Sequence, residues 1–329
     1  MKSARLTTLA LACFFVLALF YSPPLAEDAS PTNSDAHPAA YLDATVAFIP
    51  YGLDAQRIVS LAPNVTEMLF FLDLGDRVIG RSDFCNYPPE AAAIPSIGGF
   101  VDASLEKIVS LNPDLAVAYQ GNSLELIDQL RTAGLTVLAF NEPKTVDEVG
   151  RQMEALHHIA NPANTGLPVQ LILWQAHLDQ ETISGYPESE HFRCFFGYPD
   201  ETTYTCGGSS FISDLMLRAG AANVAAALSD PWPMVSTEFI VAAEPEWILT
   251  GTPCIEGKDP ATYGNQLLEQ LQADAVWSQL PAVRENRLIV IDADILMRPG
   301  PRLLDALRAL NSAFTERLIL DLSVELGAE

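Results

Sequence analysis

Short apolar runs alternate with stretches of helical periodicity in two similar series along the chain. The first series extends from Arg57 to Phe140, and the second extends from His191 to Ala328. Buried strands of a parallel sheet are almost continuously apolar, whereas the helices that connect them carry apolar residues at helical spacing. The pattern therefore predicts an α/β fold with two Rossmann-like lobes, each a central, mostly parallel sheet flanked by helices.

Individual elements follow from the same pattern. In the first series we expect strands at 57–63, 78–80, 113–118 and 134–140, with helices after Asn64, from Ser104 and from Leu124. In the second series we expect strands at 191–197, 245–250 and 288–291, helices at 211–219, 262–272 and 301–320, and a long polar loop at 198–208. Strands that alternate with helices in this way favour parallel pairing within each lobe.

A helical segment from Val146 to Ser184 separates the two series. Its periodicity breaks at Asn161–Pro162 and again near Gly166–Pro168, because proline opposes an uninterrupted helix interior. We expect a long backbone helix in two pieces, with a kink or a short loop between them. Two ordinary surface helices of one larger domain are the alternative. A helix that joins two lobes leaves a cleft between them, where small ligands bind.

The domain boundaries follow from these segments. We expect a signal peptide at 1–26, a linker with a lead-in strand at 27–56, an N-terminal α/β lobe at 57–141, a bridging helix at 142–187 and a C-terminal α/β lobe at 188–329. Lys2 and Arg5 precede an apolar run, Leu9–Phe20, that is too short for a comfortable membrane span. The mature protein should therefore be periplasmic or otherwise extracytoplasmic, with retention of the segment as a membrane anchor as the alternative.

The formal net charge of −24 restricts the partners. It argues against nucleic acid and against anionic membrane surfaces, and it is compatible with docking onto a basic patch of another protein. Mostly it describes a solvated exterior, and we expect a monomer.

Catalytic and metal-binding signatures are missing from the sequence. Ser209 and Ser210 follow a glycine pair without forming a nucleophile elbow, and no histidine lies in a loop where it could act as their base. No cysteine pair with zinc spacing and no phosphate-binding glycine loop is present. These features favour a binding protein with no catalytic residue, metal or cofactor. The alternative from another class is a metal-dependent or redox enzyme that uses Cys85.

Aromatic residues are concentrated in the loops that follow the predicted strands. Ligands of open α/β sheets bind at this edge of the sheet. We expect the following aromatic side chains to face one space: Phe84, Tyr87, Phe100, Tyr119, Phe196, Tyr204 and Trp232. Aromatic walls suit a large, flat, partly apolar ligand. The alternative is that half of these rings pack against their own lobe.

Three segments together resemble the helical-backbone substrate-binding proteins of ABC importers. They are residues 57–67, 80–90 and 104–115. Within this family, residues 86–90 and 231–238 are most similar to the members that bind cobalamin. The resemblance implies two rigid lobes joined by one long helix, with little closure on binding. It also implies capture of a corrinoid in the cleft and delivery to a membrane permease, without a catalytic step.

The resemblance further implies roles for residues of the cleft. Phe84, Phe100 and Trp232 match aromatic positions that contact the corrinoid, and Asp294 matches a polar contact in the last cleft loop. Phe100 stands where the cobalamin-binding members have tryptophan. This departure puts the ligand, rather than the fold, in doubt.

Two acidic residues match positions that dock onto the permease. Glu106 and Glu238, one on each lobe, correspond to the pair that contacts permease arginines in this family. Charge pairs of this kind set orientation and association rate more than affinity. For Glu106 the alternative is an ordinary acidic residue in the first turn of a helix.

Four cysteines remain after removal of the predicted signal peptide: Cys85, Cys194, Cys206 and Cys254. An oxidising compartment favours disulfides, and the cysteines do not match the disulfide of the cobalamin-binding members. We favour a bond between Cys206 and Cys254, which both fall in second-lobe loops on the cleft side, and a bond from Cys194 to Cys206 is the rival. Cys85 lies in a cleft loop, either as a ligand to cobalt or haem iron or as a buried inert thiol.

Other ligands of the same family are alternatives to a corrinoid. Haem would use a tyrosine ligand, for which Tyr87, Tyr119 and Tyr204 are candidates. A ferric siderophore would favour basic residues in the cleft, and Arg81 and Arg298 are the candidates. A surface sensor that keeps the fold without transport is a third possibility.

Overall fold

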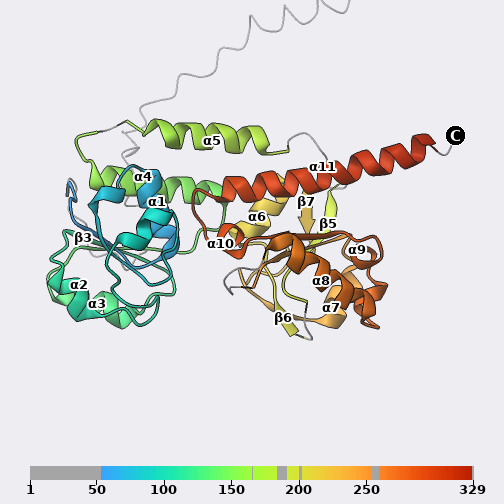
Figure 1. Ribbon diagram of the computed structural model, residues 1–329, viewed down its shortest axis with the longest axis horizontal. Helices are drawn as coiled ribbons and strands as arrows, with labels where there is room; N and C mark the ends of the chain where they lie inside the picture. The colour runs from blue at the N-terminus through green and yellow to red at the C-terminus, as the bar shows by residue number, and fades with distance from the viewer. Residues whose placement is uncertain (1–52, 165, 184–190, 200–201, 254–258, 328–329) are drawn as a thin grey trace, which may run out of the picture. The chain divides into compact units, whose positions relative to one another are not determined.

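The computed structural model describes residues 53–327 except 165, 184–190, 200–201 and 254–258, with side chains up to Glu316. This part of the chain forms two α/β lobes, each built on a four-stranded parallel sheet (Figure 1). The arrangement confirms the predicted α/β fold with two Rossmann-like lobes. The expected signal peptide, linker and lead-in strand lie outside the described residues. Within the described segments, no helix is both long enough and apolar enough to cross a membrane.

The N-terminal lobe has the strand order β2-β1-β3-β4, and each neighbouring pair is parallel. Its strands are β1 (Ile58–Ser60), β2 (Val78–Arg81), β3 (Leu115–Tyr119) and β4 (Val137–Phe140). Its helices are α1 (Pro63–Phe71), α2 (Leu105–Ser110) and α3 (Leu124–Thr132). α2 and α3 each begin at a serine, Ser104 and Ser123, whose hydroxyl accepts a hydrogen bond from a backbone N–H of the first turn.

Successive residues of β3 enter two different cores, because side chains of a strand point alternately to its two faces. Leu115 and Val117 pack in a core that also includes α1 and the C-terminal lobe. Ala116 and Ala118 pack on the opposite face with residues of α2 and α3. Both faces of this sheet are therefore covered, which explains the unbroken apolar run in the sequence.

The C-terminal lobe repeats the scheme with the parallel strand order β10-β9-β5-β7. Its strands are β5 (Phe192–Phe196), β7 (Ala221–Asn223), β9 (Trp247–Gly251) and β10 (Leu288–Ile291). Its helices are α6 (Phe211–Arg218), α7 (Thr237–Ala243), α8 (Pro260–Ala273), α9 (Pro281–Arg284), α10 (Ala293–Leu296) and α11 (Leu303–Gly327). The segment expected to be a polar loop instead contains β6 (Thr202–Tyr204), which pairs antiparallel with β8 (Met234–Ser236).

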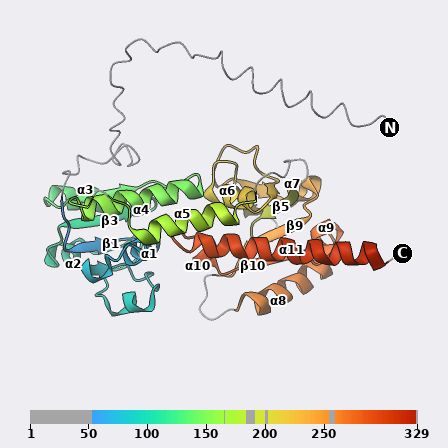
Figure 2. The same cartoon turned by 90° about the horizontal axis from the view of Figure 1, so that it is seen from above.

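Two helices, rather than one continuous helix, occupy the segment between the lobes. α4 (Val146–Ala160) ends at Asn161, and α5 (Val169–Glu181) begins after Pro168, so the break falls where the prolines predicted it. α5 packs against both α4 and α11. The three helices lie above the two sheets in Figure 1, and α5 lies between α4 and α11 in Figure 2. The bridge is therefore a packed group of helices.

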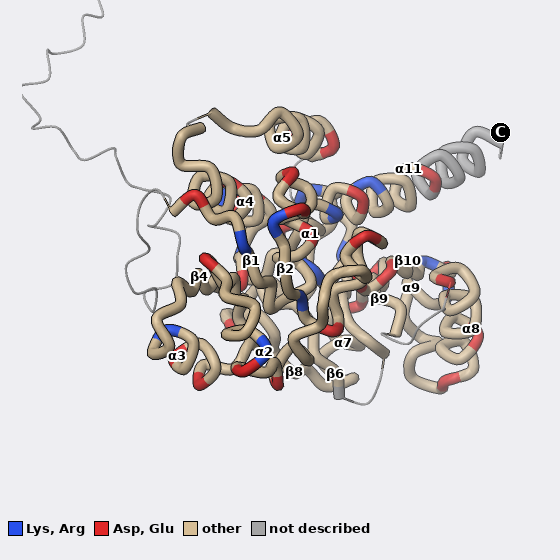
Figure 3. Tube along the Cα trace, turned by 60° about the vertical axis from the view of Figure 1, so that its left-hand side comes forward, with Lys and Arg blue, Asp and Glu red and all other residues tan. Residues whose placement is uncertain are grey.

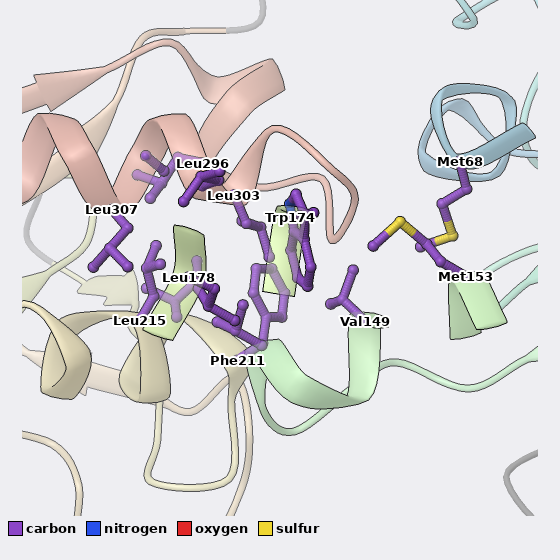
Figure 4. Packing of buried hydrophobic residues seen from close by; sticks show 14 of the residues in the cluster. Met68, Val149, Met153, Trp174, Leu178, Phe211, Leu215, Leu296, Leu303 and Leu307 are labelled. Atoms are coloured by element: carbon purple, nitrogen blue, oxygen red, sulfur yellow. The ribbon is translucent and has the colours of Figure 1, made fainter. Parts of the chain in front are cut away.

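One apolar core connects the lobes through this bridge. Met68 of α1 and Met153 of α4 lie at one end of the core, and Leu303 and Leu307 of α11 lie at the other (Figure 4). Trp174 of α5 sits between them, and its Nε1 donates a hydrogen bond to the carbonyl oxygen of Pro301 at 2.7 Å. Close-packed interiors resist deformation, so the lobes are held together by packing as well as by polar contacts.

Candidate functional site

A cavity of about 310 Å³ lies where the two lobes meet. It is lined by Pro63, Asn64, Phe84, Phe100 and Tyr119 of the N-terminal lobe and by Met297, Arg298 and Pro299 of the C-terminal lobe. The lining is almost entirely apolar. Three of the aromatic residues expected from the sequence, Phe84, Phe100 and Tyr119, thus meet at one site. Phe84 is 59% exposed, so part of the wall faces solvent.

A buried asparagine holds the N-terminal wall of the cavity in place. Asn122 Nδ2 donates to the carbonyl oxygens of Leu61 and Phe100 at 3.1 and 2.7 Å, and Asn122 Oδ1 accepts from the backbone N–H of Tyr119 at 2.8 Å. One side chain therefore connects the loops that follow β1 and β3 with the loop that carries Phe100. Because buried polar groups need partners, these bonds favour a single arrangement of the wall.

An inter-lobe network of charged and polar groups adjoins the cavity. It consists of Glu67 and Asn86 from the N-terminal lobe and Asp294, Arg298 and Arg302 from the C-terminal lobe. Arg302 Nε and Nη2 donate to the two carboxylate oxygens of Glu67 at 2.8 and 2.6 Å, and Arg298 Nη1 donates to Glu67 Oε1 at 3.2 Å. Arg298 also contacts Asp294 at 2.6 Å and donates to Asn86 Oδ1 at 2.7 Å.

Glu67 is the centre of this network and is only 3% exposed. A buried carboxylate is stable only when it is paired and hydrogen-bonded, and here two guanidinium groups supply both. Burial by itself would lower the pKa of Arg302, but the hydrogen bonds and charge of Glu67 more than offset this effect and raise that pKa. Glu67 and Arg302 were not expected from the sequence, although a glutamate inside the apolar face of α1 is an unusual feature that indicates a buried partner.

A second polar contact joins the lobes at Trp232. Its indole Nε1 donates to Glu142 Oε2 at 2.8 Å, and its ring packs edge-on against Phe196 and Phe211. Burial raises the pKa of Glu142, and the hydrogen bond from Trp232 reverses only part of this shift. Trp232 does not line the cavity, so in this structure it connects the lobes.

The three candidate tyrosines have different surroundings. The Tyr119 ring lines the cavity, but its hydroxyl is buried and has no hydrogen-bond partner among the described residues. Burial, together with the nearby Glu142 carboxylate, holds the pKa of Tyr119 well above its usual range. The guanidinium of Arg302 lies over the Tyr87 ring at 4.2 Å from its centre. Tyr204 is 61% exposed on β6 and does not line the cavity.

Phe196 and Cys85 belong to the core and not to the cavity wall. Phe196 is 2% exposed, because its position in β5 points toward the core shared by the lobes. Cys85 is 1% exposed and accepts a hydrogen bond from Thr66 Oγ1 at 3.0 Å. Burial raises the pKa of the Cys85 thiol, which leaves it protonated at neutral pH. The expectation that Phe196 faces the cleft is therefore not met in this structure, and the burial of Cys85 fits the alternative of an inert thiol.

Among the described residues, no disulfide is present. Cys194 and Cys206 are both buried free thiols, which rules out the rival bond between them in this structure. Cys206 Sγ lies 3.9 Å from Met216 Sδ, and Asn223 Nδ2 donates to Cys206 Sγ at 3.4 Å. Cys254, the favoured partner of Cys206, lies outside the described residues. Burial raises the pKa values of the Cys194 and Cys206 thiols, so neither is readily oxidised.

The remaining charged candidates occupy three different settings. Arg81 donates to backbone carbonyl oxygens around its own loop and so supports that loop. Glu106 lies in the first turn of α2 and is exposed. Glu238 lies in the first turn of α7 and is exposed, and a hydrogen bond from the Ser236 side chain lowers its pKa.

Two α/β lobes that share a bridge of helices and enclose an aromatic cavity at their junction define a two-lobed solute-binding protein. The chain belongs to the periplasmic binding protein family, whose model matches residues 58–295. Members of this family serve ABC importers, so the partners of this chain are a transported ligand and a membrane permease. The family and the fold are those of substrate-binding proteins and not of enzymes.

The similar proteins are named for two kinds of ligand, vitamin B12 and haem. The vitamin B12-binding protein of Vibrio cholerae serotype O1 is 29% identical over 267 residues, which cover 81% of this chain and 91% of that protein. A crystal structure of the vitamin B12-binding protein of Vibrio cholerae has a TM-score of 0.63 at 28% identity and covers 80% of this chain and 97% of that one. A haem-binding protein from Roseiflexus sp. RS-1 has a TM-score of 0.59 at 26% identity and covers 79% and 99%.

Proposed function

We propose that this chain captures a corrinoid of the vitamin B12 type between its lobes and delivers it to the permease of an ABC importer. The observation that carries this proposal is the apolar cavity walled by Phe84, Phe100 and Tyr119, with Met297 opposite and Arg298 as its one charged residue. Aromatic walls contribute contact area to a broad macrocycle at low entropic cost. The likeness to vitamin B12-binding proteins supports the same ligand class.

A corrinoid has to extend beyond this cavity. About 310 Å³ is at the lower end of the roughly 300–1,000 Å³ that small-ligand sites occupy, and a corrinoid is a large ligand. We place one edge of the macrocycle in the cavity and the remainder against the exposed ring of Phe84. Arg298 lines the cavity and Asp294 is its ion-pair partner, and we propose that both hydrogen bond to the carboxamide groups of a corrinoid.

Haem is the second candidate, because Tyr119 lines the cavity and a haem-binding protein is among the similar structures. An iron ligand from tyrosine acts as the tyrosinate. The Tyr119 hydroxyl is buried without a hydrogen-bond partner among the described residues, and the guanidinium of Arg302 covers the Tyr87 ring. Both tyrosines are therefore poorly suited to bind iron, which favours the corrinoid.

A ferric siderophore fits this site least well. Anionic siderophores require cationic side chains that are available to the ligand. Arg81 is used by backbone carbonyl groups, and Arg298 is already paired with Glu67 and Asp294. The charge of the cleft is thus compensated before a ligand arrives.

We also propose that Glu106 and Glu238 dock onto basic side chains of the permease. Each carboxylate is exposed near the start of a helix, one on each lobe. Two charged contacts on separate lobes would fix the orientation of the complex. Delivery requires export, for which we assign residues 1–26 as a signal peptide.

A pair of matched substitutions tests the proposed site. Phe84 and Tyr204 are almost equally exposed aromatic residues, but only Phe84 lines the cavity. We expect Phe84→Ala to weaken cyanocobalamin binding by about tenfold, and Tyr204→Ala to change it by less than about twofold. Isothermal titration calorimetry of the purified mature protein measures both. Equal losses in the two variants, or no loss in Phe84→Ala, would place the ligand elsewhere.

A further inference from the structure

A second and larger hollow lies on the C-terminal lobe, apart from the inter-lobe cavity. It has a volume of about 940 Å³ and is bordered by α7, α8 and the turn that contains Trp277. Leu267, Leu271 and Trp277 form an apolar floor, because each is largely buried in the core of this lobe but still reaches the hollow. We call this hollow the α7/α8 groove. None of its residues takes part in the proposed ligand site.

The rim of the groove carries negative charge next to an exposed apolar side chain. Glu238 and Asp274 line the rim, and Val276 is exposed beside them. A hydrogen bond from Ser236 lowers the pKa of Glu238, and backbone N–H groups of Trp277 and Val276 lower the pKa of Asp274. Both carboxylates therefore stay ionised when a partner approaches.

The helices that border the groove lie on the same side of the protein as α2, the helix that contains Glu106. In Figure 1, α2 and α3 of one lobe and α7 and α8 of the other lie on the side away from α5 and α11. A smaller hollow of about 640 Å³ lies between α2 and α3, where Leu105, Glu125 and Asp128 contribute to its lining, and Glu106 follows Leu105 in the chain. Acidic positions are visible on both α3 and α8 (Figure 3). Each docking glutamate is thus accompanied by a hollow on its own lobe.

An exposed ion pair alone gives little affinity, because water and salt screen it. A specific complex needs buried apolar contacts near its charged contacts, with an anchor side chain in a well-fitting pocket. The α7/α8 groove offers that combination, since an apolar floor lies directly beside an ionised glutamate. Its acidic rim is complementary to a basic segment and would repel an acidic one.

We infer that the α7/α8 groove receives an extracytoplasmic loop of the permease, in which a basic side chain pairs with Glu238 and an adjacent apolar side chain fills the space above Leu267, Leu271 and Trp277. The inference rests on the proposed docking role of Glu238 and extends it to a defined surface. The groove supplies affinity and the glutamate supplies orientation. The hollow beside Glu106 is smaller, so the C-terminal lobe carries the larger share of the contact.

Two substitutions on α8 separate the groove from the charge. Gln270 and Gln266 are both exposed glutamines one turn apart, but only Gln270 lines the groove. Gln270→Trp fills the groove without altering any charge, and Gln266→Trp adds the same bulk outside it. Biolayer interferometry measures the dissociation constant of the ligand-loaded chain for its permease complex. The permease complex is held in lipid nanodiscs, free of detergent and of nucleotide. Calorimetry with cyanocobalamin checks that each variant still folds and binds.

We expect Gln270→Trp to weaken permease binding by about tenfold and Gln266→Trp to change it by less than about twofold. Glu238→Gln should weaken binding and make it less dependent on salt. If Glu238→Gln weakens binding but Gln270→Trp does not, the permease loop does not bind in the groove, although Glu238 still contributes to docking. If the wild-type chain does not bind the permease, or if Glu238→Gln has no effect, the docking proposal fails together with the groove.

Discussion

At the scale of single residues, Glu142 shows how a lobe contact depends on protonation. Its carboxylate accepts the Trp232 hydrogen bond, while burial raises its pKa above the ordinary value of 4.5. The folded protein therefore holds a proton on this group more tightly than the unfolded chain does. The stabilisation from this proton is fully present below about pH 4.5 and is lost as the pH rises through the folded-state pKa. Ionised Glu142 thus weakens the fold at neutral pH.

Replacing Glu142 by glutamine should reverse this effect. Glu142→Gln keeps an oxygen that accepts from Trp232 and removes the charge. We predict a higher free energy of unfolding than wild type at pH 7, and a difference that shrinks as the pH falls toward about 4.5. Urea unfolding at several pH values measures this difference. Glu316→Gln, at an exposed position of α11, is the control and should leave the free energy of unfolding nearly unchanged. A Glu142→Gln variant less stable than wild type at pH 7 would contradict the prediction.

Some cavity residues were predictable from sequence one at a time, and others were not. Phe84, Phe100 and Tyr119 were expected because aromatic residues in loops after parallel strands gather at one edge of a sheet. Phe196 also ends a strand, but strand alternation allows either face, and the sequence does not show which face of β5 meets the core. Glu67 has no local partner, because Arg302 lies 235 residues away along the chain.

At the scale of elements, the inter-lobe network joins helix α1 to the segment that contains α10 and the start of α11. Glu67 is the only contribution of α1 to this network, and its two arginine partners both come from the C-terminal lobe. Removal of one partner from a buried ion pair leaves an uncompensated charge in the interior. Removing one member of the network should therefore destabilise the lobe contact strongly, whatever the net contribution of the intact network.

We predict that Glu67→Ala lowers the free energy of unfolding at pH 7 by about 3–5 kcal/mol, because Arg298 and Arg302 lose the carboxylate between them. Asp128→Ala is a suitable control. Its carboxylate faces solvent and pairs with Arg131 at 3.8 Å, so we expect a loss of less than about 1 kcal/mol. Guanidinium chloride unfolding measures both variants. Similar losses for the two would show that the buried pair has no special role.

The elements themselves were predictable where they are long or apolar. β3 and β9 were predicted as buried strands from their apolar sequences. Every residue of each strand is buried in the structure. β7, β8 and α7 were missed, since each is short and lacks a period of its own. β8 is a strand because it pairs with β6, and β6 lies in the segment that was expected to be a polar loop. The proline positions gave the break between α4 and α5 because proline affects the backbone locally.

At the scale of the whole molecule, one core and a set of polar contacts hold the lobes in a single arrangement. The core extends from α1 through α4 and α5 to α11, and Glu67 and Glu142 add polar contacts between the lobes. We expect a protein connected in this way to capture its ligand in a nearly preformed site, in contrast to hinged binding proteins that close around it. Under the proposed function, specificity would depend on which macrocycle fits the aromatic wall and the rim formed by Asp294 and Arg298.

The most direct test of corrinoid capture is a parallel titration of the purified mature protein with cyanocobalamin, haemin and a ferric siderophore. Calorimetry and tryptophan fluorescence report binding to each ligand. We predict saturable one-to-one binding of cyanocobalamin, with weaker or no binding of the other two. Tight binding of haemin or the siderophore, with none of cyanocobalamin, would contradict the proposed ligand while leaving the family and its transport role intact.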